Sequence, residues 1–483
     1  MKKATILIVF MFYFINISAQ HYAQKYYPEE DEIAAKKIKE WQNMKFGLLM
    51  HWGAYSQWGV VESWSICAED VGWTKRKKGK TPENYTEYKK EYEHLKNSFN
   101  PVKFNPDKWA KAADYAGMKY VIFTTKHHDG FCMFDTKYTD YKVTDKGCAF
   151  SNNKKANITK EIFDAFRDKG FWVGPYFSKP DWHNENYWWP NFATPDRNVN
   201  YDIKKYPERW EKFVQFTHNQ IMELMTGYGK IDILWLDGGW VAPLSREQIV
   251  EHMMKPNYQF THLQSQDVRI GELKKKAREK QPGLIVVDRA VEGPNQNYLT
   301  PENQIPGKLL PYPWESCIIA GGGWSYVPDA KFMSTRKLIY TLVDIVSKGG
   351  NLLLNIAPSP EGTWDKAAYD LLNEMGDWMK INSEAIYNSK PLSPYKEGKV
   401  CLTQQNDGTV YAIYLSDKDE NKPPSKIWMS NYQPNKNAQI TMLGSKTKLK
   451  WEAVGNGFEV VIPESLQKKA PCNYAWVLKI KKN

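Results

Sequence analysis

The residue with the clearest chemical promise is Asp237, a carboxylate that directly follows a short apolar run. The run Ile231–Leu236 is apolar except for Asp232, and two glycines follow the carboxylate. Such a run is typical of a strand buried on both faces in a parallel sheet covered by helices. Enzymes built on α/β barrels place their catalytic groups where such strands meet their loops. We therefore interpret Asp237 as a candidate reacting group at the mouth of a barrel.

Four other candidate strands also lead into polar chemistry. One ends in His51 and another in His127 and His128, while two more lead to Tyr176 and Arg289. A single buried histidine or arginine at a strand end usually has a structural role, with its hydrogen bonds made to neighbouring groups. Five strand ends that meet at one face of a barrel are better explained by a polar pocket.

Carboxyl groups are the reacting groups that remain after other chemistries are considered. The sequence has no Gly-x-Ser-x-Gly nucleophile motif, and Cys132 lies in an apolar run. The histidines lack the His-Glu-x-x-His spacing and the six cysteines form no Cys-x-x-Cys pair, so we expect no metal, with zinc as the alternative. Glycoside hydrolysis needs two carboxyl groups, one as nucleophile or base and one as an acid with a raised pKa.

Strands and helices alternate through most of the chain. The candidate parallel strands are Phe46–Met50, Tyr120–Thr125, Phe171–Phe177, Ile231–Leu236, Leu284–Val287 and Asn351–Ile356. Helical stretches separate several of them, at Pro106–Ala116, Ile158–Lys169, Glu208–Thr226 and Ser334–Val346. This alternation predicts an α/β protein with a (β/α)8-like (TIM) barrel. Eight clean strands cannot be counted, so a distorted or incomplete barrel is also allowed.

The pattern changes after Tyr387. Short alternating runs separated by turn residues follow, and they predict a C-terminal antiparallel β-sandwich. We place the boundary at Asn388–Pro394, which gives a barrel over 20–388 and a sandwich over 389–483. The sandwich has no polar cluster, so we expect a packing domain, with a carbohydrate-binding module as the alternative. We expect Trp428, Trp451 and Trp476 to lie in its core.

The first residues have the pattern of a signal peptide. Two lysines precede the apolar run Ala4–Ile17, which closes on Ser18-Ala19-Gln20. The run is too short for a convincing membrane span, and no second one follows. We expect residues 1–19 to be a signal peptide cleaved near Ala19-Gln20 and the protein to be secreted or periplasmic.

The chain is basic, with a formal net charge of +11 at pH 7. Much of this charge comes from lysine clusters such as Lys75–Lys78, which we interpret as solvated surface. No stretch resembles a nucleic-acid module, so we expect no nucleic-acid partner. A sulfated or uronic polysaccharide nearby is the alternative explanation.

An ordered set of motifs resembles the α-L-fucosidases of glycoside hydrolase family 29. The matching segments are His51–Gly53, Lys126–Phe131, Trp235–Gly239, Trp314–Cys317, Gly323–Tyr326 and Gly349–Ile356. They occur in family order from roughly Met44 to Gly376. One departure is Phe131–Phe134, where many members place Leu-Trp after the cysteine, and it bears on pocket shape. The resemblance implies an exported barrel with a C-terminal sandwich and no metal or organic cofactor.

The resemblance also implies what the site residues do. It places the nucleophile of a retaining exo-hydrolase at Asp237 and a fucosylated oligosaccharide or polysaccharide as its substrate. It implies sugar-binding roles for His51, Glu62, Trp64, His127, His128, Tyr176, Trp235 and Arg289. Neutral histidines and an arginine can bond ring hydroxyls, while aromatic rings can face the apolar methyl group of fucose.

Two glutamates compete for the role of acid/base. Glu302 matches the position used by several bacterial members of the family. Glu315 is the alternative, and it can also be a support residue beneath the pocket. We favour Glu302, because an acid that must reach the leaving oxygen belongs on a loop.

The sequence therefore leads us to expect an exo-acting α-L-fucosidase that works by double displacement. Within enzymes, the alternative is a related exo-glycosidase such as an α-L-galactosidase, whose substrate differs by a C6 hydroxyl. Outside enzymes, the alternative is a non-catalytic, fucose-binding, lectin-like protein. The retained carboxylate Asp237 is evidence against a lectin.

Overall fold

The computed structural model describes residues 25–69, 75–255, 260 and 263–481. The expected signal peptide, residues 1–19, lies outside these described residues. Among the described helices, none is both long enough and apolar enough to cross a membrane.

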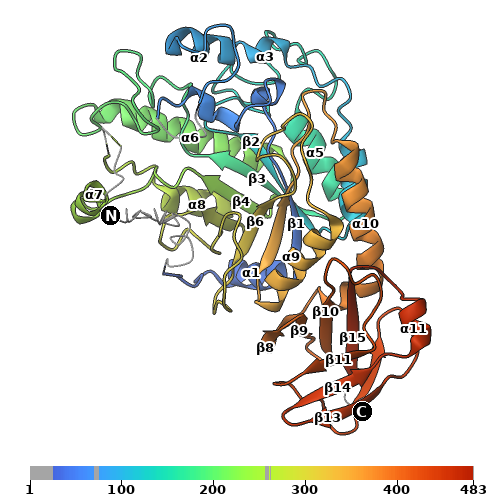
Figure 1. Ribbon diagram of the computed structural model, residues 1–483. Coiled ribbons are helices and arrows are strands. Elements are labelled where there is room, and N and C mark those ends of the chain that lie inside the picture. The colour runs from blue at the N-terminus through green and yellow to red at the C-terminus, as the bar shows by residue number, and fades with distance from the viewer. Residues whose placement is uncertain (1–24, 70–74, 256–259, 261–262, 482–483) are drawn as a thin grey trace, which may run out of the picture.

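A curled parallel sheet of seven strands forms the larger part of the molecule (Figure 1). Its strands are β1 (Phe46–Met50), β2 (Tyr120–Lys126), β3 (Trp172–Ser178), β4 (Ile233–Asp237), β5 (Ile285–Asp288), β6 (Glu315–Ile319) and β7 (Asn351–Asn355). They pair in the order β5-β4-β3-β2-β1-β7-β6. Each expected strand is found within two residues of its expected bounds. Strand β6 was not predicted, since its five residues begin with two polar ones, Glu315 and Ser316.

An irregular segment fills the gap between the two edge strands, β5 and β6. Gln296 of this segment forms a bridge with Val287 of β5. Leu299 forms one with Trp314, the residue before β6, and Glu302 forms one with Cys317 of β6. The segment therefore takes the place of a further barrel strand, both in chain order and between the two edges of the sheet. This explains why eight clean strands could not be counted in the sequence.

Helices surround this sheet, and several of them cover its outer face. Those of the barrel region are α1 (Glu32–Met44), α2 (Tyr85–Glu93), α3 (Leu95–Ser98), α4 (Pro106–Tyr115), α5 (Ile158–Arg167), α6 (Pro207–Gly227), α7 (Arg246–Met253), α8 (Ile270–Lys280), α9 (Thr335–Ser347) and α10 (Lys366–Asn382), with short 3-10 turns η2 (Ala54–Gln57), η3 (Glu62–Ile66) and η5 (Ser383–Ala385). Helix α5 packs against β2 and β3, and α9 packs against β7. All four expected helices are present. Their starts follow local capping chemistry, for example the Asn157 side chain, which accepts a bond from Lys160 N at the start of α5.

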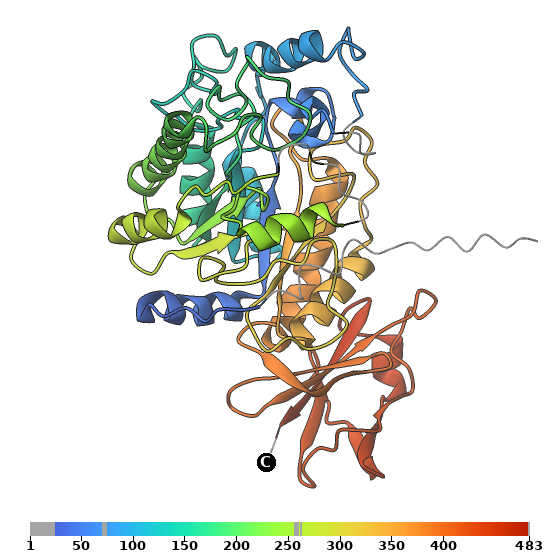
Figure 2. The same cartoon turned by 90° about the vertical axis from the view of Figure 1, so that its left-hand side faces the viewer.

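Two antiparallel sheets form the C-terminal part, as expected for a β-sandwich. The strands are β8 (Lys390–Glu397), β9 (Val400–Gln404), β10 (Val410–Leu415), β11 (Lys426–Met429), β12 (Gln439–Met442), β13 (Lys450–Val454), β14 (Gly457–Val461) and β15 (Ala475–Lys481), with one short helix, α11 (Glu464–Lys468). One sheet has the order β12-β15-β10-β9-β8 and the other β11-β14-β13. Figures 1 and 2 show both sheets below the barrel, with β11, β14 and β13 farther from it.

The larger of these sheets is apolar on both faces. In β10, Tyr411 and Ile413 belong to the core shared with the barrel, while Ala412 and Tyr414 belong to the core inside the sandwich. Successive residues of a strand point to opposite faces, so one strand serves both cores. One face of this sheet is therefore covered by the second sheet of the sandwich and the other by the flank of the barrel.

The tryptophans of the sandwich depart from expectation at one position. Trp476 is fully buried and Trp451 is partly buried, as expected for core residues. Trp428 is 62% exposed, so its expected place in the core is wrong. The alternation of β11 explains this, because Ile427 and Met429 take the inward positions.

Candidate active site

The carboxyl ends of the parallel strands bring the candidate residues together. The ring centroids of His51 and Tyr176 are 5.0 Å apart, and those of His127 and His128 are 4.1 Å apart. Tyr176 stacks on Trp235 at 5.2 Å. Each of these residues lies in or directly after β1, β2, β3 or β4, so strand order alone makes them neighbours.

Asp237 ends β4 and is held from two sides. Its Oδ2 accepts a hydrogen bond of 2.5 Å from the Tyr176 hydroxyl, and its Oδ1 accepts one of 2.9 Å from Nη1 of Arg289. His128 Nε2 is 3.9 Å from Oδ2. These bonds restrict the rotation of the carboxylate, so its oxygens keep a defined direction at the mouth of the barrel.

The charge of Asp237 is favoured despite its burial. Burial raises the pKa of this carboxyl, but the Arg289 cation and the Tyr176 hydrogen bond outweigh burial and hold the pKa far below its usual range. Asp237 is therefore an anion at any pH near neutrality. An ionised carboxylate is the form that a nucleophile requires.

Glu302 lies on the irregular segment between β5 and β6. Its Oε2 is paired with Nη2 of Arg289, and its Oε1 accepts a 3.0 Å bond from Nε1 of Trp324. About a third of its side chain is exposed to solvent, compared with 14% for Asp237. One guanidinium thus contacts both carboxyl groups, and the more accessible of the two lies on a loop.

Glu315 lies in a different environment, at the start of β6. Its carboxyl group accepts bonds from the Tyr120 hydroxyl at 2.5 Å and from Nε1 of Trp235 at 3.4 Å. The side chain is fully buried, and burial raises its pKa to about 7. Tyr120 begins β2, so Glu315 lies inside the barrel beneath the strand ends. Its contact with Trp235 makes it a support for the pocket wall.

Three histidines in the pocket are uncharged at neutral pH. Burial lowers the pKa of His51 to about 4 and that of His128 to about 3, and it lowers the pKa of His127 well below its usual value. Neutral imidazoles offer one donor and one acceptor nitrogen each, which suits sugar hydroxyls.

Supporting residues set the orientation of two of these rings. Nδ1 of His51 bonds Oδ1 of Asn355 at 3.0 Å, while Nδ2 of Asn355 donates to the Trp324 carbonyl at 2.8 Å. Because Nδ2 of Asn355 donates to that carbonyl, Oδ1 of Asn355 must be the acceptor for His51. Nδ1 of the neutral His51 ring therefore carries the proton, and Nε2 is left as an acceptor. Nδ1 of His127 is bonded to Ser63 Oγ.

Glu62 adds a third carboxyl group to the pocket. Its Oε1 accepts a 2.7 Å bond from the Ser325 backbone N–H, and the side chain is buried. Burial, together with the charges of Glu302 and Asp237, raises the pKa of Glu62 to about 8. Glu62 is therefore protonated at neutral pH and can donate a hydrogen bond.

Aromatic rings surround His128. The ring centroids of Trp64 and Trp240 lie 5.3 Å and 5.0 Å from that of His128, and Trp182 lies 5.1 Å away. The Arg197 guanidinium lies over Trp64, 4.6 Å from its centroid. This wall is apolar and close to Asp237, so it suits the apolar parts of a sugar.

Several supporting residues were missed from the sequence. Asn355 and Trp324 belong to motifs that had been noted, but no role was assigned to either. Ser325 also belongs to one of these motifs, the segment Gly323–Tyr326, and it too was given no role. Ser63 carried no signal, because its partner His127 lies far from it in the chain.

One group of side chains could hold a metal ion. Atoms of His127, His128 and Asp237 that could ligate a metal lie within 4.8 Å of one another. No second group of this kind is found among the described residues. Both oxygens of Asp237 already accept hydrogen bonds, and the neighbouring Arg289 cation repels a metal ion. The arrangement therefore favours carboxylate chemistry.

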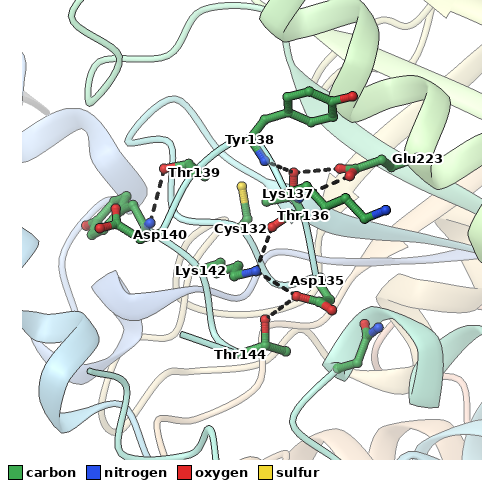
Figure 3. A network of polar contacts seen from close by, with 12 residues as sticks. Cys132, Asp135, Thr136, Lys137, Tyr138, Thr139, Asp140, Lys142, Thr144 and Glu223 are labelled. Atoms are coloured by element: carbon green, nitrogen blue, oxygen red, sulfur yellow. Dashed lines mark hydrogen bonds and ion pairs between the residues drawn. The ribbon is translucent and has the colours of Figure 1, made fainter. Parts of the chain in front are cut away.

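The departure from the family pattern lies in the core. Phe131, Cys132 and Phe134 are all buried, and they pack in the main core. The loop that follows is fastened by side chains (Figure 3): Asp135 accepts bonds from Lys142 at 2.8 Å and Thr144 at 2.7 Å.

This fastening extends to the outer helices. Thr136 donates a 2.6 Å bond to Glu223 of α6, and the Lys137 backbone N–H donates a 3.0 Å bond to the same carboxylate (Figure 3). The loop after β2 is thereby tied to α6 and anchors the strand end that carries the two adjacent histidines.

Comparisons with known proteins agree with this geometry. The family model described as Alpha-L-fucosidase matches residues 13–384, and that of the Alpha-L-fucosidase C-terminal domain matches residues 395–481. The chain belongs to the α-L-fucosidase family. Plasma alpha-L-fucosidase of Homo sapiens is 27% identical over 484 residues, covering 95% of this chain and 93% of that protein. Alpha-L-fucosidase of Branchiostoma floridae is 26% identical, covering 97% and 98%.

Solved structures of α-L-fucosidases share the fold. Alpha-L-fucosidase isoenzyme 1 from Paenibacillus thiaminolyticus has a TM-score of 0.72 and 27% identity, over 93% of this chain and 99% of that chain. Alpha-fucosidase of Thermotoga maritima in complex with fucose has a TM-score of 0.69 and 25% identity, over 92% and 96%. The expected barrel followed by a sandwich is confirmed.

The buried Glu315 leads to a prediction about stability. Its folded pKa of about 7 exceeds the 4.5 of an ordinary glutamate. Between pH 4.5 and about pH 7 the folded protein keeps a proton on Glu315 that the unfolded chain has lost. The contribution of this group to the free energy of unfolding therefore falls by about 1.4 kcal/mol for each unit by which the pH rises. Glu315→Gln keeps the acceptor for Tyr120 but does not titrate. Urea unfolding at about pH 5 and about pH 7 should show a smaller loss of stability in the variant than in the wild type.

A matched control is Glu361→Gln, which removes a surface carboxylate paired with Lys103. That control should keep the wild-type pH dependence. Equal pH dependence in Glu315→Gln and the wild type would show that the carboxyl group is not held protonated in the fold.

Proposed function

We propose that this protein is a retaining, exo-acting α-L-fucosidase that releases terminal L-fucose from glycans. The observation that carries the proposal is the shared Arg289, which contacts the buried anion Asp237 and the more accessible Glu302. A retaining glycosidase requires two carboxyl groups about 5–5.5 Å apart, one as nucleophile and one as acid/base. Membership of the α-L-fucosidase family and the fucose complex of the Thermotoga maritima relative support fucose as the sugar.

The first half-reaction forms a covalent intermediate. Asp237 attacks the anomeric carbon and forms a carbon–oxygen bond, while the bond to the leaving oxygen breaks. Glu302 gives its proton to that oxygen, so the leaving group departs as an alcohol. The product is a fucosyl ester of Asp237.

The second half-reaction restores the enzyme. Water attacks the anomeric carbon from the face that the leaving group vacated, and Glu302 accepts a proton from it. The ester bond breaks, Asp237 regains its charge, and fucose leaves with its configuration retained.

Arg289 keeps charges balanced through both steps. In the intermediate Asp237 is a neutral ester, and Glu302, which has given up its proton to the leaving group, is the anionic partner of Arg289. Arg289 donates to both groups, so its positive charge always has one anionic partner. The cation therefore stabilises the resting site and the intermediate alike.

The remaining pocket residues recognise the sugar. The neutral histidines and the protonated Glu62 supply hydrogen bonds to hydroxyls, and Tyr176 reaches the sugar beside Asp237. Trp64 and Trp235 supply apolar surface for the C6 methyl group.

Export and domain division complete the proposal. We propose a signal peptide over residues 1–19 and a secreted or periplasmic location, which fits the plasma relatives among the curated proteins. We also propose a catalytic barrel over 20–388 and a sandwich over 389–483. No metal or organic cofactor takes part in the proposed reaction.

Replacement of the nucleophile tests the reaction directly. Asp237→Ala should reduce turnover of an aryl fucoside by about four orders of magnitude or more, because no ester can form. Azide should restore part of the activity and give a fucosyl azide of inverted configuration, since it attacks the substrate itself. Activity close to the wild type would contradict the assignment.

Replacement of the acid/base should leave a different signature. Glu302→Ala should slow substrates with poor leaving groups by about 10²–10⁴-fold, and activated aryl fucosides far less. Azide should here give a product of retained configuration, because it attacks the intermediate on Asp237.

The matched comparison for that variant is Glu315→Gln. If Glu315→Gln shows the dependence on leaving group and Glu302→Ala does not, the two roles must be exchanged.

A further inference from the structure

Trp428 differs from the other tryptophans of the sandwich. The indole N–H groups of Trp451 and Trp476 each donate a 2.9 Å bond to a backbone carbonyl, of Ala438 and Cys472 respectively. No such bond and no ring contact is found for Trp428 within the described residues, and its side chain is 62% exposed. Its ring and its N–H donor are both open to a ligand.

The ring lies on a rigid support. On either side of Trp428 in β11, Ile427 and Met429 are buried in the core of the sandwich. Central strand β14 pairs with β11 on one side and β13 on the other. The strand that carries Trp428 is therefore fixed by the core beneath it and by its pairing with β14.

Charged hydrogen-bonding groups surround the ring. In the strand register Trp428 lies opposite Glu459, which lies opposite Glu452. The next row carries Lys426 and Lys450, one on each side of Val461. The two lysines and two glutamates sum to zero charge, and the Lys426–Glu459 pair, at 2.5 Å, holds one carboxylate beside the ring.

We propose that this outward face of β11, β14 and β13 binds a neutral, extended glycan chain. One pyranose ring would stack on Trp428, since aromatic rings match the apolar face of a sugar. Glu452 and Glu459 would accept bonds from hydroxyls, while the indole N–H and a lysine would donate. The inference extends the proposed function, because it names a second site through which a fucosylated glycan is held.

Protein partners fit this face less well. Its exposed large apolar side chains are Trp428, Val454 and Val461. A stable protein interface buries about 800 Å² on each partner around an apolar core, which three separated side chains among charges do not provide. A polyanion is disfavoured because the face has no excess of positive charge.

The position of the face defines its role. Figure 1 shows β13 and β14 at the end of the molecule away from the barrel, and the active-site residues lie at the far ends of the barrel strands. The face is therefore separate from the pocket that holds Asp237. The face therefore anchors the protein to a polymer and leaves the hydrolysis of small fucosides unchanged.

The test uses the full-length protein in affinity gel electrophoresis. The probes are fucosylated xyloglucan and the same polymer after removal of its fucose, and the second is not a substrate. The wild type should be retarded by both polymers. Trp428→Ala should weaken retardation about tenfold or more, the effect of losing one stacking contact, and Trp428→Phe should retain most of it. Activity on an aryl fucoside should stay at the wild-type level in both variants.

Val454→Ala is the matched control, because it removes an exposed apolar side chain from the same face. It should bind as the wild type does. The melting temperature of Trp428→Ala should also be unchanged, since the residue is on the surface.

The inference would be overturned by no retardation of the wild type, by equal retardation of Trp428→Ala and the wild type, or by a change in oligomeric state caused by Trp428→Ala. Retardation abolished by free L-fucose would assign the binding to the catalytic pocket instead. Retardation without any fucosidase activity would refute the proposed function and leave the anchoring face intact.

Discussion

The guanidinium of Arg289 lies between two carboxyl groups, and the chemistry of the pocket depends on this ion triad. Taking a carboxylate out of water costs several kcal/mol, about what a close and well-bonded cation returns. Arg289 donates to Asp237 at 2.9 Å and also pairs with Glu302, so neither carboxyl group lacks a partner. The Arg289 cation is the largest of the influences that oppose burial and hold the pKa of Asp237 below its usual range.

The same burial sets the state of the surrounding groups. It keeps the pocket histidines neutral and Glu62 protonated, so the sugar meets hydrogen-bonding groups of low charge. The charges closest to the reacting groups are therefore those of Arg289, Asp237 and Glu302, with the Arg197 guanidinium over the Trp64 ring. In such a dry environment, the attraction between those charges is stronger than in water.

Much of the site could be predicted because buried parallel strands carry a plain signal. An apolar run that ends in a polar residue gives both the strand and the side chain at its mouth, as with Asp237 and His51. The segment that holds Glu302 gave no such signal, since it closes the barrel with isolated bridges instead of a regular strand. Strand β6 was missed because Glu315 points its carboxyl group into the barrel, where Tyr120 and Trp235 satisfy it.

Other features depend on contacts that no local pattern encodes. Asn355 orients His51 across more than three hundred residues of chain, a pairing that only the closed sheet creates. The exposure of Trp428 depends on which face of the four-residue strand β11 packs on the core. In so short a strand, the alternation of apolar and polar residues is too brief to predict that face. The sequence alone therefore does not predict the supporting hydrogen bonds, nor which face of a short strand points to the core.

The central claim is that Asp237 forms a covalent bond to the sugar. The most direct measurement is mass spectrometry of the protein after incubation with 2-fluoro-fucosyl fluoride, followed by proteolysis and sequencing of the labelled peptide. The fluorosugar should be found on Asp237, with a mass gain of one 2-fluoro-fucosyl group per chain. A label on Glu302 or Glu62, or turnover of fucosides with inverted configuration and no label, would contradict the claim.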